Sequence, residues 1–208
     1  MGRYTGPVCR LCRQAGEKLF LKGERCFTPR CAVERRRRPP GEVHFRRPRV
    51  SDWGLQLREK QKARYSYGVL ESQFRRYFEQ AQKSPGTTGE TLIQLLERRL
   101  DNVVFRLDFA ESRSQARQLV LHRHITVAGR KVTIPSYQVS PGEVIGWAET
   151  SQGQDFVKEL AAAIPRKSVP GWLSLDKDTL SGQVVHSPKP SEVDSSINTR
   201  IIVEYYSK

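Results

Sequence analysis

Hydrophobic residues recur at helical spacing in the stretch from residue 51 to residue 83. Leu70, Phe74, Tyr77 and Phe78 lie four, three and one positions apart, so they share one side of a helix. Gly68 precedes this run and predicts a break in the helix. We therefore expect a helical lobe whose second half buries an apolar stripe.

The first 50 residues show no such periodicity. Pro39, Pro40 and Pro48 exclude a continuous helix in the second half of this stretch. The pattern predicts an irregular amino-terminal segment.

A short stretch rich in Gly, Thr, Ser and Pro follows the helical lobe. The sequence SPGTTGE at residues 84–90 is typical of a turn or linker and indicates a domain boundary. Thr87 with Glu90 three positions later resembles a capping box, which predicts one helix through TLIQLLERRLDNVVFRL, residues 91–107.

A second capping signature, Ser112 with Gln115, predicts a shorter helix over RSQARQLVLH, residues 113–122. Apolar and polar residues then alternate in HITVAGRKVTI around Ala128–Gly129, which predicts a β-hairpin. Pro141–Gly142 predicts a further turn, followed by a short strand. The order helix, helix, strand, strand, strand indicates a compact α+β unit.

The C-terminal stretch after Pro165 is rich in Pro, Ser and Gly. Val193, Ile197, Ile201 and Tyr205 are spaced by four, which predicts a final helix, although RIIVEYY alone is also compatible with a strand.

These patterns together predict a mixed α/β fold of the α+β type that is predominantly helical. It has four parts: a basic amino-terminal segment (1–50), a helical lobe (51–86), a small helix–helix–β domain (87–164, core 98–160), and a C-terminal extension (165–208) whose final helix packs back on the helical lobe.

The charge distribution points to a class of partner. The net charge is +14, and residues 1–83 alone hold 21 Lys and Arg against 8 Asp and Glu, a net of +13. Such a block typically binds a polyanion; a solvated basic tail without a dedicated partner is the alternative. Without an amphipathic stripe, a bilayer-length apolar run or a secretory signal, a cytoplasmic protein that binds no membrane is expected.

Four cysteines form the pattern C-x2-C-x13-C-x4-C in the most basic part of the chain: Cys9, Cys12, Cys26 and Cys31. Two close pairs joined by a loop can place four thiolates tetrahedrally around zinc, at sulfur–metal distances of about 2.3 Å. Disulfides would suit a secreted chain, but no secretory signal is seen and the cytosol keeps thiols reduced, so disulfides are not expected. The spacing favours one structural Zn²⁺ with four Cys ligands, with an iron–sulfur cluster and free or redox-active thiols left as alternatives.

Metal binding would also explain how so basic a segment folds, because a segment this poor in apolar residues needs folding free energy from elsewhere. The arginines that follow the cysteines are candidate contacts to the polyanion: Arg35, Arg36, Arg37, Arg38, Arg46 and Arg47.

A second basic cluster lies in the predicted small domain. Residues 98–131 hold eight Lys and Arg against three Asp and Glu, a net of +5. Arg113 and Arg117 are four apart and share a helix face. A solvated helix face is the alternative interpretation.

Several stretches of the sequence resemble one family. LLERRLDNVVFRLDFAESRSQARQLVLHRHITVAGRKVTIPSYQVSPGEVI is similar to the small RNA-binding domain named after small-ribosomal-subunit protein number four, the S-four family. LREKQKARYSYGVLESQFRRYF, VPGWLSLD and INTRIIVEYYSK are similar to other parts of that family. MGRYTGPVCRLCRQAGEKLFLKGERCFTPRC resembles the zinc-bearing form of its amino terminus, so the similarity extends over nearly the whole chain.

The resemblance implies a structural constituent of the small ribosomal subunit that binds the 5′ domain of small-subunit rRNA early in assembly. It also implies a place beside protein S-five, near the channel by which mRNA enters, with an influence on decoding accuracy. Carried over by motif, the RNA-facing residues are Arg58, Lys62, Arg64, Arg75, Arg76, Arg98, Arg99, Ser112, Arg113, Gln115, Arg117, His122, Arg130 and Lys131.

Three positions depart from the family pattern. Asp108 stands where the family often has Gly, Arg123 replaces the Gly of a His-Gly-His sequence, and Ala128 replaces the Asn of an Asn-Gly turn. A side chain at position 123 disfavours a positive φ.

Two other classes of function fit the sequence less well. RLD at 99–101 is similar to the catalytic stretch of one class of pseudouridine synthases, but Asp101 is better explained as a helix residue near two arginines, and no other stretch is large enough for a catalytic sheet. A zinc-dependent DNA-binding regulator lacks a two-histidine finger and a dimerising heptad. We expect no catalysis and no small-molecule substrate.

Overall fold

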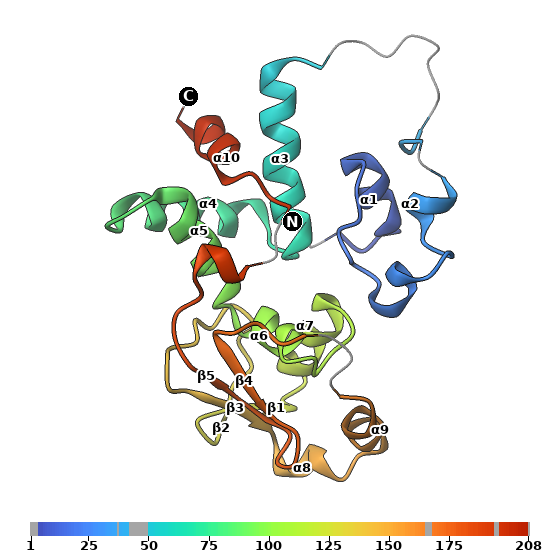
Figure 1. Ribbon diagram of the computed structural model, residues 1–208, viewed down its shortest axis with the longest axis vertical. Helices are drawn as coiled ribbons and strands as arrows, with labels where there is room; N and C mark the ends of the chain where they lie inside the picture. Colours follow the sequence, from blue (N-terminus) through green and yellow to red (C-terminus); the bar gives the residue numbers. More distant parts are fainter. Residues whose placement is uncertain (1–3, 37, 42–49, 165–167, 194–195, 208) are drawn as a thin grey trace. The chain divides into compact units, whose positions relative to one another are not determined.

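The computed structural model describes residues 4–36, 38–41, 50–164, 168–193 and 196–207 (Figure 1). The chain forms two compact units, one of residues 1–89 with 195–208 and one of residues 90–194. The protein is of the α+β class, as the sequence predicted, with helices in both units and one antiparallel sheet. None of the helices described is both long and apolar enough to span a bilayer.

The amino-terminal segment contains short helical turns where the sequence predicted irregular structure. They are α1 (Cys9–Ala15), the 3-10 helix η1 (Gly23–Phe27) and α2 (Ala32–Arg35). Gly16 ends α1 with a φ of +83°, and its N–H bonds to the Cys12 carbonyl, which is the conformation that glycine adopts without strain.

The helical lobe consists of α3 (Asp52–Ser66), α4 (Glu71–Lys83) and α10 (Thr199–Tyr206). The predicted break at Gly68 is confirmed by its φ of +62°. Phe74, Tyr77 and Phe78 are buried as the stripe predicted, whereas Leu70 precedes α4 and stays partly exposed.

The last helix, α10, packs against α3 although more than a hundred residues separate them (Figure 1). The Tyr206 ring stacks on Phe78 with a centroid distance of 4.5 Å. The helix begins only at Thr199, later than the four-residue spacing suggested, because the Asn198 side chain caps it by accepting from the N–H of Ile201.

The second unit starts with helices α5 (Thr88–Glu97), α6 (Leu100–Arg106) and α7 (Arg113–Leu121). The single helix predicted over 91–107 is wrong, because the backbone is extended at Arg99. There the N–H of Leu100 donates to the Tyr137 carbonyl (2.8 Å) and that of Asp101 to the Pro135 carbonyl (3.1 Å). Bonds to a distant loop thus replace helical bonds.

The predicted hairpin is confirmed. Strands β1 (Ile125–Val127) and β2 (Arg130–Lys131) pair through a turn in which both Ala128 and Gly129 have positive φ, as a type I′ turn requires. The predicted third strand is β3 (Val144–Trp147), which pairs with β1.

Two further strands complete the sheet, and the sequence did not predict them. Strands β4 (Leu173–Asp176) and β5 (Ser181–Val184) form a hairpin, and β5 pairs with β3, giving the order β2-β1-β3-β5-β4 (Figure 1). Residues 173–184 therefore belong to the small domain, and not to a separate C-terminal extension. The sequence pattern does not reveal these two strands, because each is only four residues long and lies in a Pro-, Ser- and Gly-rich stretch.

Gly182 lets β5 approach the helices of this unit closely, since a Cβ there would lie 2.4 Å from the Leu107 side chain. The core between helices and sheet includes Val103, Phe109, Ile145 and Trp172. The unit also contains the short helices α8 (Glu149–Gln152), α9 (Asp155–Ala163) and η2 (Pro190–Glu192).

Candidate RNA interface and cysteine cluster

The four cysteines are free thiols contributed by α1, η1 and the residue before α2. Burial raises the pKa of the Cys12 thiol, and charge on the other three cysteines raises it further. However, the described residues contain no group of three or more His, Cys, Asp or Glu side chains arranged to hold a metal ion.

Backbone amides point at two of the sulfurs. The N–H of Lys22 donates to the Cys26 sulfur at 3.3 Å, and the N–H of Leu19 bonds to Cys12, which lowers the pKa of that thiol against the effect of burial. Such bonds favour thiolates, the form in which cysteine binds a metal. Thiolate sulfurs are therefore suitable donors for a structural metal, although the four cysteines are not arranged around a common point.

The arginines after the cysteine cluster are largely open to solvent. Arg35, Arg36 and Arg38 are exposed, and Arg37, Arg46 and Arg47 lie outside the described residues. The exposed members are available to a polyanion.

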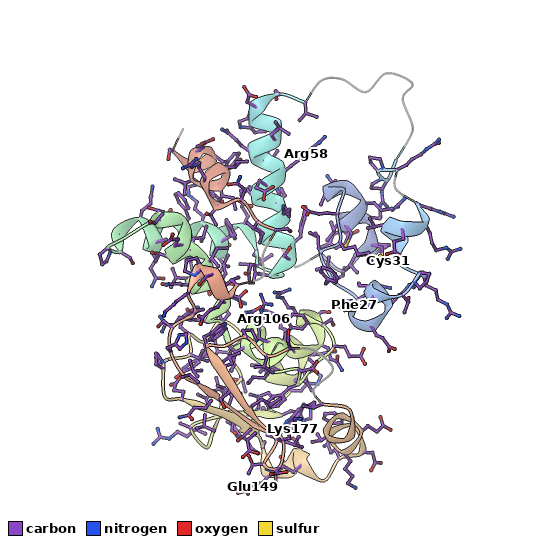
Figure 2. The ribbon with its side chains drawn as sticks, viewed as in Figure 1. Phe27, Cys31, Arg58, Arg106, Glu149 and Lys177 are labelled. Atoms are coloured by element: carbon purple, nitrogen blue, oxygen red, sulfur yellow. The ribbon has the colours of Figure 1, made fainter. Side chains whose placement is uncertain are left out.

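The predicted RNA contacts in the helical lobe differ in their exposure to solvent. Arg58 on α3 (Figure 2), together with Arg75 and Arg76 on α4, is exposed. Arg64 is half-buried, with its guanidinium 4.7 Å from the Tyr65 ring centroid and 3.7 Å from Glu71.

Lys62 faces the interior of its own unit and not RNA, contrary to the sequence prediction. Its ammonium lies 2.7 Å from Glu17, 3.0 Å from Glu59 and 2.6 Å from the Ser196 carbonyl. Burial alone would lower the pKa of Lys62, but the bonds to the two carboxylates outweigh it and raise the pKa above its ordinary value. The lysine thus joins the amino-terminal segment, α3 and the chain before α10.

The predicted exposure of Arg99 to RNA is also contradicted, because this side chain is fully buried. It makes a two-pronged ion pair with Asp101, at 3.0 Å and 2.7 Å, and Asp101 accepts a further bond from Arg117 at 3.2 Å. A guanidinium committed in this way is not open to a phosphate. Arg117 is only partly buried, with 22% of its side chain exposed.

A parallel network, which sequence reasoning missed, is built on the buried Glu97. Its carboxylate accepts from Arg106 at 2.7 Å and 3.0 Å and from the Asn102 amide at 2.8 Å. The Asn102 oxygen in turn accepts from Arg113 at 2.8 Å, and the Arg113 guanidinium lies 4.6 Å from the Phe105 ring centroid. Buried acids thus position the arginines Arg106, Arg113 and Arg117.

Four further predicted contacts are exposed on the small domain: Gln115, His122, Arg130 and Lys131. Arg98 is half-buried and donates to the Val139 carbonyl at 2.8 Å. Ser112 caps α7 by accepting from the N–H of Gln115, which confirms the predicted cap and leaves the hydroxyl largely buried.

The three positions that depart from the family pattern all have left-handed backbone. The φ angles are +62° at Asp108, +66° at Arg123 and +47° at Ala128. Side chains rarely adopt this conformation without strain, so each of these three residues carries a backbone cost.

Comparison with known proteins gives consistent matches. The family model described as "Ribosomal protein S4/S9 N-terminal domain" matches residues 3–97, and the model described as "S4 domain" matches residues 98–145. The chain is 55% identical over all 208 residues to "Small ribosomal subunit protein uS4" of Heliobacterium modesticaldum. It is 54% identical to "Small ribosomal subunit protein uS4A" of Symbiobacterium thermophilum and 53% identical to the uS4 protein of Pelotomaculum thermopropionicum, with both chains covered completely in each comparison.

Proposed function

Because the chain belongs to the ribosomal protein S4 family along its whole length, we propose that it binds the 5′ domain of small-subunit rRNA early and directly and so nucleates assembly. The family consists of structural, non-enzymatic proteins of the small ribosomal subunit. The chain is therefore an rRNA-binding constituent of that subunit, located on the cytoplasmic ribosome.

The observation that carries the proposal is that buried side chains, one amide and one acid, hold two guanidinium groups in place. Arg113 and Arg117 are fixed by Asn102 and Asp101, and both remain partly exposed. Side chains fixed before binding lose less conformational entropy when they meet phosphates. Together with the exposed Arg130 and Lys131 on β2, they suit recognition of a folded RNA through its phosphates and 2′-hydroxyls.

Binding to RNA transcripts tests the proposed place in assembly. Full-length protein should bind an isolated 5′-domain transcript in the absence of other ribosomal proteins, with an affinity that falls steeply with salt. Arg130→Ala should lower the slope of log affinity against log salt by about one phosphate contact. Binding only to particles already loaded with other proteins would contradict early, direct binding.

The proposal extends to neighbours within the subunit. A position beside protein S-five and near the channel by which mRNA enters would let the protein influence decoding accuracy. Crosslinking in purified small subunits should join the chain to S-five and to mRNA, and misreading should change in strains that carry interface variants. Crosslinks only to other proteins would exclude this position.

For the cysteines we propose one structural Zn²⁺, held by Cys9, Cys12, Cys26 and Cys31. Support comes from the spacing of the four cysteines in the sequence and from the amides of Leu19 and Lys22, which bond to two of the sulfurs. Four thiolates leave no open position for a substrate. Native mass spectrometry should find one zinc per chain, lost in Cys12→Ser. A chain with visible iron–sulfur absorbance, or an ordered segment without metal, would contradict the proposal.

A further inference from the structure

Two phenylalanines of the amino-terminal segment lie outside its small core. Leu11, Leu19 and the cysteines Cys12, Cys26 and Cys31 are buried, whereas 62% of Phe27 and 39% of Phe20 are exposed. In a segment so poor in apolar residues, burying these rings would be the natural source of stability. The exposure of these two phenylalanine side chains therefore points to a partner outside the segment.

The two rings form a defined platform. Their centroids are 5.1 Å apart, with an angle of 26° between the ring planes. One face of Phe27 is thus covered by Phe20, while its large exposed fraction leaves the opposite side open. Phe20 has a φ of +51°, a conformation that is unfavourable for a bulky residue.

The surroundings of the platform carry a net positive charge, because three exposed basic residues outnumber the exposed acid Glu24. Phe27 is the last residue of η1 (Figure 2), and Lys22, Arg25 and Arg30 close to it in the chain are all exposed. Arg25 Nε reaches the Arg30 carbonyl at 3.5 Å, so the two arginines lie on neighbouring turns. An apolar protein surface has no negative charge to pair with these cations. A nucleic-acid strand offers phosphates for the cations and flat bases for the aromatic rings.

From this arrangement we propose that Phe27, backed by Phe20, is a stacking platform for one unpaired nucleobase of the bound RNA, with Lys22, Arg25 and Arg30 holding the flanking phosphates. Sequence-tolerant stacking of a base on an aromatic side chain, combined with a basic groove, is a common way to bind single-stranded RNA. This site rests on the proposed rRNA binding and adds a contact that the charge pattern alone did not indicate.

The salt dependence of binding separates stacking from phosphate contact. In titrations of zinc-loaded, full-length protein with a small-subunit rRNA transcript, Phe27→Ala should weaken binding roughly 5- to 150-fold. The slope of log affinity against log salt should stay unchanged, because no phosphate contact is lost. Arg25→Ala should instead reduce that slope by about one contact.

Matched variants identify the chemistry of the contact. Phe27→Tyr should keep the affinity, whereas Phe27→Leu should lose most of it, since leucine retains apolar area without a ring face. Phe156→Ala is the control, because Phe156 is a phenylalanine exposed to the same extent as Phe20 (39%), and it lies between Asp155 and Glu159 on α9, where its ring contacts His124 and Trp147 of its own unit. It should bind as the unaltered protein does. Chemical probing should show one nucleotide that is protected with Phe27 or Tyr and reactive with Ala.

The outcomes are distinguishable. If the unaltered protein fails to bind the transcript, the proposed function and this site both fall. If the unaltered protein binds and Phe27→Ala or Phe27→Leu binds equally well, the stacking site alone is overturned. A loss of affinity in Phe27→Ala accompanied by a lower salt slope also overturns it, because the defect is then electrostatic.

Discussion

The guanidinium of Arg99 and the carboxylate of Asp101 form an ion pair with both side chains buried, at 2.7 Å between Nη2 and Oδ2. The pair lies where α6 begins and also holds Arg117. The buried guanidinium of Arg99 and one candidate RNA contact, Arg117, therefore share a single carboxylate.

Asp101→Asn should destabilise the second unit by roughly 3–5 kcal/mol, because it removes the carboxylate charge that pairs with the buried guanidinium of Arg99. Urea unfolding followed by tryptophan fluorescence measures this, since Trp147 and Trp172 are buried in that unit. Asp155→Asn is the control, as Asp155 pairs with Lys158 only on the surface, and it should change little. Equal stability of the two variants would show that Arg99 is accommodated without its partner.

Arg123→Gly should stabilise the protein without RNA by roughly 0.5–1 kcal/mol, because glycine adopts a positive φ without strain. Arg123 is exposed, so little packing is lost. Thermal unfolding should show a higher midpoint. Gly129→Ala, at a φ of +77°, should have the opposite effect. A lower midpoint for Arg123→Gly would mean that the arginine side chain contributes more than its backbone costs.

Lys62→Met should destabilise the first unit by roughly 1–3 kcal/mol, since Glu17 and Glu59 lose their shared cation in a partly buried site. Denaturant unfolding followed by circular dichroism tests it. Arg75→Met is the control, because Arg75 and Glu79 form an exposed pair on one helix. If Lys62 acted chiefly on RNA, as its motif position suggested, the variant would unfold normally and lose only affinity.

Glu71→Gln should make stability less sensitive to acid. Burial tends to raise the pKa of Glu71, but bonds from Lys60 and Tyr206 outweigh it and hold the pKa below the ordinary value of 4.5. A lowered pKa in the folded state means that the unfolded chain takes up protons first. The contribution of ionised Glu71 to stability is therefore complete above pH 4.5, and it is lost as the pH falls through the lowered pKa of Glu71.

Unfolding midpoints measured from neutral pH down to acid should accordingly fall less for Glu71→Gln than for the unaltered protein. Glu79→Gln, on the exposed side of α4, serves as the control and should keep the original pH profile. Parallel profiles for all three proteins would contradict the role of Glu71.

Local signals in the sequence were sufficient where the interacting residues are close along the chain. The break at Gly68, the cap at Ser112 and the turn at Ala128–Gly129 all formed as predicted, because each depends on backbone preferences within a few residues. Spacing and charge likewise singled out the four cysteines and the arginine clusters, whose binding roles stay predictions.

The tertiary structure decided what depends on distant partners. Arg98 and Arg99 look alike in the sequence, yet only Arg99 is fully buried, because bonds from Leu100 and Asp101 to the loop at 135–137 turn the backbone there. Lys62 faces inward for the same kind of reason, since its partners Glu17 and Ser196 come from remote segments. Strand β5 could not be predicted from its own residues, because a strand that short is stabilised by its neighbours β3 and β4.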